Sequence, residues 1–202
     1  MAARSNAGTE LTRLWLEHRH GCLVRESVQV PVRRSYSDID FIAVHRTQEK
    51  ILLPNGANID PRLAVETKDE HDGPSGGEFG KLLRADFSKI MNEGFIPLGT
   101  VDINFTMLKA EHFHVASKFL GTTDFDRLFI VHALDDTTRA EVCSVLATRH
   151  RIHWLTIPEM VTDLFHWYES VDKAERVSLR NTLSGDLFHL LVGYCGFGPI
   201  KQ

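Results

Sequence analysis

Two segments place charged residues inside apolar, strand-like sequence, and they constrain the fold more than any other feature of the chain. The segment 37–44 reads Ser-Asp-Ile-Asp-Phe-Ile-Ala-Val, and the segment 63–68 reads Leu-Ala-Val-Glu-Thr-Lys. Because side chains alternate along a strand, Glu66 and Lys68 share one face of the second segment. If the two strands pair, both residues lie next to Asp40 at one end of a sheet.

The residue types at this predicted sheet end are those that a phosphodiester hydrolase uses. Carboxylate oxygens are the ligands that a hard cation such as Mg²⁺ prefers. A neighbouring lysine supplies a positive charge for a phosphate or a bound hydroxide. Together these groups suit metal-assisted hydrolysis. The alternative is surface charge on an unrelated α/β domain, but charges set into apolar strands are costly unless they are paired.

Asp40, followed by the tripeptide Glu66-Thr67-Lys68, resembles the motif of the PD-(D/E)XK nucleases. That superfamily includes restriction endonucleases and archaeal Holliday junction resolvases. The resemblance runs from the N-terminus through residue 90, with a continuation to Ile157. Ile39 stands where the family has its proline, but the aspartate carries the metal chemistry. The resemblance implies an α/β fold with a restriction endonuclease-like core, which is a mixed central sheet flanked by helices in the order αβββαβ.

The resemblance also implies roles for the charged residues. Asp40 and Glu66 would be the main ligands of Mg²⁺, for which Mn²⁺ can substitute. Lys68 would orient or help deprotonate the attacking water and stabilise the developing negative charge. Asp38 lies two residues before Asp40, and strand alternation places it on the same face. Its role is either an indirect contact with the metal site or simple exposure to solvent.

A further acidic ligand is predicted in the first helix. Apolar residues recur at helical spacing over Thr9 to His20, and Gly21 follows at the position where helices commonly end. In the junction resolvases a glutamate opens the first helix, ahead of a strand and the aspartate-bearing strand. Glu10 matches that order, and Glu17, two turns along the same face, is the competing candidate. Glu10 is also an acid of the kind that the helix dipole favours at an N-terminus.

Basic residues that can contact a DNA backbone fall in three places. Arg33 and Arg34 follow the predicted strand 22–32, and Lys81 and Arg84 lie on the polar side of a predicted helix over 78–92, which also carries Lys89. The third place is the run Arg149-His150-Arg151. The net charge of −4 is weak evidence against a nucleic-acid partner, yet binding needs only a local basic patch. Each of these side chains can equally be a solvated surface charge.

The second half of the chain predicts parallel strands. An apolar strand over 127–134, a helix over 139–150 and a strand over 152–157 form a strand–helix–strand unit with a right-handed crossover. A helix is also predicted over 107–120, where His112 and His114 are too close in sequence to share a face as metal ligands. We interpret these two histidines as a structural or surface feature.

We expect two regions, a nuclease core over 1–157 and a C-terminal helical extension over 158–202. The extension contains apolar helices that either pack on the core or form a dimer interface. The three cysteines lack the paired spacing of a zinc site, and no apolar run approaches the roughly 20 residues of a membrane span. With no apolar targeting segment at the N-terminus, we expect a cytoplasmic protein.

The predicted function is a Mg²⁺-dependent DNA endonuclease, either a restriction or defence enzyme or a junction resolvase. The modest number of lysines and arginines, 23 in all, favours a homodimer whose combined surface binds a duplex. The alternative function is a catalytically inactive module that keeps the nuclease fold and binds nucleic acid or serves a structural role.

Overall fold

The computed structural model describes residues 7–32, 35–68, 109–131, 139–179 and 181–194. Its first half contains α1 (Ala7–Leu14), a short π-helix η1 (Trp15–Arg19), and strands β1 (Cys22–Val32), β2 (Ser35–His45), β3 (Ile51–Leu52), β4 (Asn58–Ile59) and β5 (Arg62–Lys68). Its second half contains α3 (Ala110–Leu120), β6 (Asp126–Val131), α4 (Arg139–His150), β7 (Ile152–Thr156), α5 (Ile157–Ser170), α6 (Lys173–Leu179) and α7 (Leu183–Tyr194).

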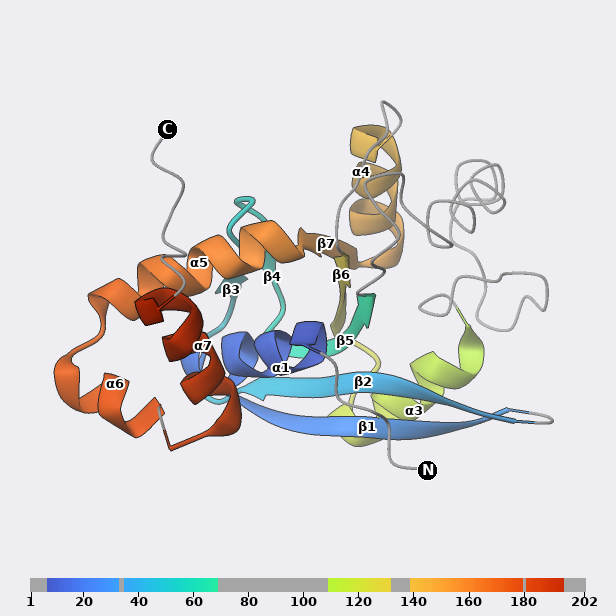
Figure 1. Ribbon diagram of the computed structural model, residues 1–202. Helices are drawn as coiled ribbons and strands as arrows, with labels where there is room; N and C mark the ends of the chain where they lie inside the picture. The colour runs from blue at the N-terminus through green and yellow to red at the C-terminus, as the bar shows by residue number, and fades with distance from the viewer. Residues whose placement is uncertain (1–6, 33–34, 69–108, 132–138, 180, 195–202) are drawn as a thin grey trace.

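A mixed sheet of five strands organises the described residues, in the order β1-β2-β5-β6-β7 (Figure 1). The pairs β1–β2 and β2–β5 are antiparallel, whereas β5–β6 and β6–β7 are parallel. Helix α4 connects the parallel strands β6 and β7, so the predicted strand–helix–strand unit is confirmed. The protein is therefore an α/β protein with a mixed central sheet flanked by helices.

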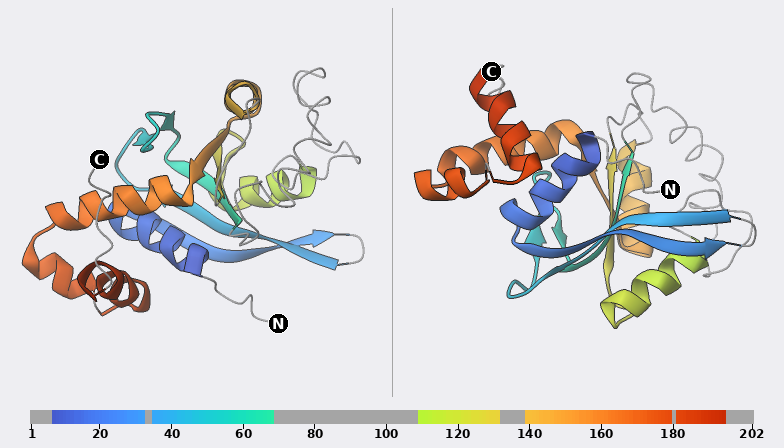
Figure 2. Two further views of the ribbon diagram at one scale, coloured as in Figure 1. Left: turned by 45° about the horizontal axis from the view of Figure 1, so that its top comes forward. Right: turned by 60° about the horizontal axis from the view of Figure 1, so that its bottom comes forward.

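The two faces of the sheet pack against different helices (Figure 2). The larger core joins Phe41 and Val65 of the sheet to apolar residues of α1, η1 and the C-terminal helices, including Leu14 and Leu164. The smaller core joins Val28 and Val30 of β1 and Ile39 of β2 to Ala116 of α3. Both faces of the sheet are therefore covered, which is the usual arrangement for a sheet with parallel strands.

The C-terminal helices are part of the larger core. Leu164 of α5 and Phe188 of α7 pack in the same cluster as the buried residues of β5 and β6. Thr156 caps α5, because its hydroxyl accepts the Glu159 N–H and the Glu159 carboxylate accepts the Thr156 N–H. The helix therefore begins directly at the end of β7 and runs across the sheet. Among the described residues, no helix is long and apolar enough to cross a membrane.

Strand β2 changes its packing at Asp40. The β1–β2 ladder includes the pairs Glu26↔Phe41 and Val28↔Ile39 but omits the pair between them, Ser27 with Asp40. Ser27 has a φ of +48°, a left-handed conformation that is uncommon for a residue other than glycine. Phe41 packs in the larger core, whereas Ile39 packs in the smaller one. Strict alternation of side chains is therefore interrupted at Asp40. It no longer implies that Asp38 and Asp40 lie on the same face of the sheet.

Several predicted elements are confirmed and others are wrong. The strand over 22–32 and the helix over 139–150 have the predicted bounds. Pro31 and the polar run that follows it to Ser37 predict a turn, but this is wrong, because Pro31 pairs with Tyr36 and both strands extend into the run. Leucines at helical spacing predict one helix over 178–194, whereas the structure has two helices there, α6 and α7. The first helix contains a π-helical turn before it ends at Gly21, where φ is +64°.

Candidate active site

The two strands that carry the predicted carboxylates are direct neighbours in the sheet. Phe41 of β2 pairs with Val65 of β5, so Asp40 and Glu66 directly follow the last pair of this ladder. The carboxylate Oδ2 of Asp40 accepts the backbone N–H of Thr67 at 2.7 Å. This hydrogen bond reaches across from β2 to β5 and fixes the orientation of the Asp40 carboxylate beside the Glu66 segment.

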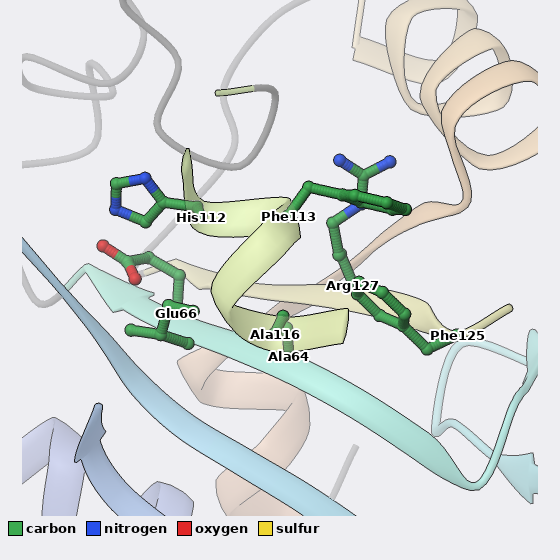
Figure 3. Close-up of a pocket in the computed structure, with 8 residues that line it drawn as sticks. Ala64, Glu66, His112, Phe113, Ala116, Phe125 and Arg127 are labelled. Carbon is green, nitrogen blue, oxygen red and sulfur yellow. The ribbon is translucent and has the colours of Figure 1, made fainter. Parts of the chain in front are cut away.

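Glu66 points into a small pocket between the sheet and α3 (Figure 3). Only 5% of the residue is exposed, although it carries a carboxylate. The lining is mostly apolar and comes from β2, β5, β6, α3 and the residue that precedes β6: Ile39, Ala64, Glu66, His112, Phe113, Ala116, Phe125 and Arg127. Burying a charged carboxylate in such surroundings costs free energy unless other groups stabilise the charge. Buried ionisable groups of this kind are common at functional sites.

Thr67, the next residue of β5, faces the opposite side of the sheet. Its hydroxyl lies 3.2 Å from the hydroxyl of Thr12 in α1, and only 6% of the residue is exposed. Strand alternation predicts that Thr67 points away from Glu66 and into the core, and this prediction is confirmed. The contact also shows that α1 covers the face opposite to the Glu66 pocket.

The contacts of Glu10 connect it to the C-terminal helices. Its Oε2 accepts a hydrogen bond from Ser184 of α7 at 2.7 Å and lies 3.2 Å from the guanidinium of Arg13. Glu17, the competing candidate, lies 3.9 Å from the same guanidinium. Arg13 also pairs with Glu26 of β1 at 3.1 Å, so it joins α1 to β1 and α7.

Two cationic or titratable side chains of the pocket were not predicted as site residues. Burial lowers the pKa of Arg127 to about 10, against the opposing effect of Asp126, so the guanidinium stays charged at neutral pH. It lies 5.7 Å from the centre of the Phe113 ring and donates to the carbonyl of His150. The sequence predicts Arg127 only as part of an apolar strand, because the residues that follow it, Leu128 to Val131, are hydrophobic.

His112 is the second unpredicted residue of the pocket. It is 5% exposed, and its Nε2 lies 3.0 Å from the hydroxyl of Ser37 in β2. Burial and the charge of Lys109 lower its pKa to about 4, against the opposing effects of Glu111 and Asp38. His114, two residues along α3, is exposed. The two histidines therefore point to different faces of α3, as predicted. The buried one, His112, is the one that lines the pocket.

The described residues offer two acidic ligands for a cation and not a complete set of protein ligands. Within residues 7–32, 35–68, 109–131, 139–179 and 181–194, no group of three or more histidines, cysteines and acids is placed to hold a metal ion. Mg²⁺ commonly binds one or two carboxylates and keeps several waters. Asp40 and Glu66 are two carboxylates from adjacent strands, which is the number of protein ligands that such a site uses.

Several predicted residues lie outside the described part of the chain. These are Arg33, Arg34, Lys81, Arg84, Lys89 and the side chain of Lys68, whose backbone pairs with Val131 at the end of β5. The other candidates are described, and Asp40 and Glu66 are the two that the sheet brings together. No family model, curated protein or solved structure matches this chain.

Proposed function

We propose that this protein is a Mg²⁺-dependent DNA endonuclease with a restriction endonuclease-like core, either a restriction or defence enzyme or a junction resolvase. One observation carries the proposal: β2 and β5 are neighbours, and Asp40 is fixed by the amide that follows Glu66. Two carboxylates from adjacent strands, followed by Lys68, are the arrangement that the PD-(D/E)XK resemblance implies. The proposal includes a homodimer that binds duplex DNA.

The order of elements supports this core. A helix precedes three antiparallel strands of the main sheet, and helices and two parallel strands follow. This succession fits the αβββαβ order with two further features, the small β3–β4 hairpin and the C-terminal helices. Because fold does not determine function, the support for the activity comes from the site residues.

The protein's own residues would orient the substrate and the attacking water. Asp40 and Glu66 together place negative charge at the sheet end, where they would hold the cation. Bound Mg²⁺ supplies charge neutralisation on the phosphate and a more acidic water. Lys68 would orient that water and stabilise the negative charge that develops on the phosphate. The apolar walls near Glu66 limit access of bulk water, which strengthens these electrostatic interactions.

A cleavage panel tests the proposal. Supercoiled plasmid, linear duplex, single strand and four-way junction are incubated with the protein and Mg²⁺ or Mn²⁺, with EDTA as the metal-free control. We expect cleavage of at least one substrate, and loss of it in Asp40→Asn and Glu66→Gln. Glu49→Gln, which changes an exposed acid, is the matched control. Inactive wild-type protein, or active D40N and E66Q variants, would refute the proposal.

A second candidate is a nuclease-fold module without activity. The observation that favours it is the lack of a three-donor group among the described residues. Glu10, the third predicted ligand, is engaged by Ser184 and Arg13. The same panel separates the two functions, because an inactive module binds one of the substrates in a mobility-shift assay without cutting it and without responding to Mg²⁺.

A further inference from the structure

His112 closes the helical side of the pocket that holds Glu66. Both residues are 5% exposed, and Figure 3 shows the imidazole of His112 on the same side of the pocket as the Glu66 carboxylate. Phe113 and Ala116 of the same helix provide the apolar part of the lining. Helix α3 therefore contributes one polar group next to the predicted metal ligand.

The same imidazole reaches the strand that carries Asp40. Its Nε2 lies 3.0 Å from the Ser37 hydroxyl, three residues before Asp40 in β2. Because burial and Lys109 hold the pKa of His112 near 4, the ring is neutral at pH 7 and the bond joins two neutral groups in either tautomer. The contact is therefore maintained without a charge in the apolar wall.

This support is needed because β2 loses its usual partner next to Asp40. The ladder with β1 omits Ser27 and Asp40, and the ladder with β5 ends at Phe41. Where the strand pairing is interrupted, a metal-binding carboxylate needs other contacts to hold it to within a fraction of an ångström. The Thr67 N–H fixes the carboxylate, and the Ser37–His112 bond ties the preceding part of β2, which pairs with β1, to α3 as well.

We propose that His112 is a positioning residue for the Asp40–Glu66 pair, holding β2 against α3 and closing the pocket beside Glu66. This inference rests on the proposed function, because it takes the two carboxylates as the metal site. Partners that orient metal ligands typically change metal affinity by about 10- to 100-fold when they are replaced. His112 would act through the strand and the pocket wall.

Mn²⁺ binding to the full chain, measured by titration calorimetry, tests the inference. His112→Leu places an apolar side chain of similar size in the pocket wall and removes the hydrogen bond, and we expect about 10-fold weaker binding with a cooperative melting transition retained. His112→Gln restores a polar partner for Ser37 and should bind within about 3-fold of wild type. His114→Leu, at the exposed histidine of the same helix, is the matched control and should bind as wild type does.

Ser37→Ala tests the other side of the bond and carries the experiment if H112L does not fold. We expect the same loss of affinity, and no additional loss in the double variant, since both changes remove one interaction. If Asp40→Asn abolishes Mn²⁺ binding while H112L or S37A binds as wild type does, the positioning role is wrong and the proposed function stands. Wild-type protein that binds no Mn²⁺ overturns both.

Discussion

Acidic residues gather toward both ends of β5, but their surroundings differ. Near its start, Asp60, which precedes β5, and Asp126, the first residue of β6, bind the guanidinium of Arg151, which also pairs with Asp124. Toward its other end, Asp40 accepts a backbone N–H and Glu66 lines a pocket. Guanidinium groups fix the first set into the fold, whereas in the second set Asp40 is held by a backbone amide and Glu66 lines a pocket. Substitutions should therefore cost stability at one end and activity at the other.

The arginine-bound end also explains an unusual backbone. Arg151 has a φ of +53°, between the end of α4 and the start of β7. This left-handed conformation costs about 1–2 kcal/mol for a residue with a side chain. It places the guanidinium among three aspartates that come from before β5 and the start of β6. The ion pairs offset the backbone strain, so this region is built for stability.

The largest expected effect is on activity, from Glu66→Gln. Removing the negative charge while keeping the shape should lower cleavage by about 1000-fold, or ~4 kcal/mol of transition-state stabilisation. The free energy of unfolding should change by less than about 1 kcal/mol, because a buried carboxylate is itself costly. Rates in Mg²⁺ and a urea titration measure the two quantities. A large loss of stability would show that Glu66 resembles the arginine-bound aspartates.

Arg151→Met should have the opposite profile. It leaves the buried Asp60 and Asp126 with less compensation, and we expect the free energy of unfolding to fall by about 2–3 kcal/mol, less than for a fully buried pair because Arg151 is partly exposed. Mn²⁺ affinity should not change. Arg46→Met, at an exposed arginine, is the control for the loss of charge. Equal stability of both variants in urea would remove the basis of the comparison.

The sequence predicted the strands of the sheet well because their signals are local. Strand-forming apolar runs gave β1 and β5, and the alternation of strand, helix and strand gave the parallel half of the sheet. The adjacency of β2 and β5 followed from the carboxylates that both carry. The strands and the helix are each signalled within one continuous segment, whereas the pairing of β2 with β5 was inferred from chemistry that two separate segments share.

The sequence could not predict features that depend on distant contacts. The interruption at Asp40 depends on the left-handed backbone of Ser27, a residue type that does not signal that conformation. The sequence left His112 as a structural or surface feature, because its partner Ser37 is 75 residues away in sequence. Glu10 was placed by analogy with a family, whereas its contact with Ser184 depends on how α7 folds back over α1.

Buried histidines make stability depend on pH, and His112 links that dependence to the pocket. The pKa values of His20, His112 and His150 are each lowered to about 4, chiefly by burial. The unfolded chain binds these protons near pH 6.5. The free energy of unfolding therefore has its full value above that pH and decreases as the pH falls toward 4. At pH 5 each histidine should cost about 1–2 kcal/mol.

The variant His112→Leu should therefore show a smaller loss of unfolding free energy between pH 7 and pH 5, by about 1–2 kcal/mol. Urea titrations at the two pH values measure it. His114→Leu should keep the wild-type pH dependence, because that histidine is exposed. Identical pH dependence in H112L and wild type would mean that His112 is solvated, and the closed pocket beside Glu66 would then be in doubt.

The smallest effect is expected from Ser184→Ala, which removes the hydroxyl that donates to Glu10 and accepts from Arg13. Ser184 is 3% exposed, and the loss of such hydrogen bonds should lower the free energy of unfolding by about 1 kcal/mol. If Glu10 serves only to join α1 to α7, Mn²⁺ affinity measured on the same variant will not change. A change in affinity would instead assign Glu10 to the carboxylate site, because the substituted hydroxyl lies on another helix and its contact with Glu10 is the one that orients this carboxylate. The measurement thus decides whether the acidic residue of α1 belongs with the stabilising contacts or with the pocket.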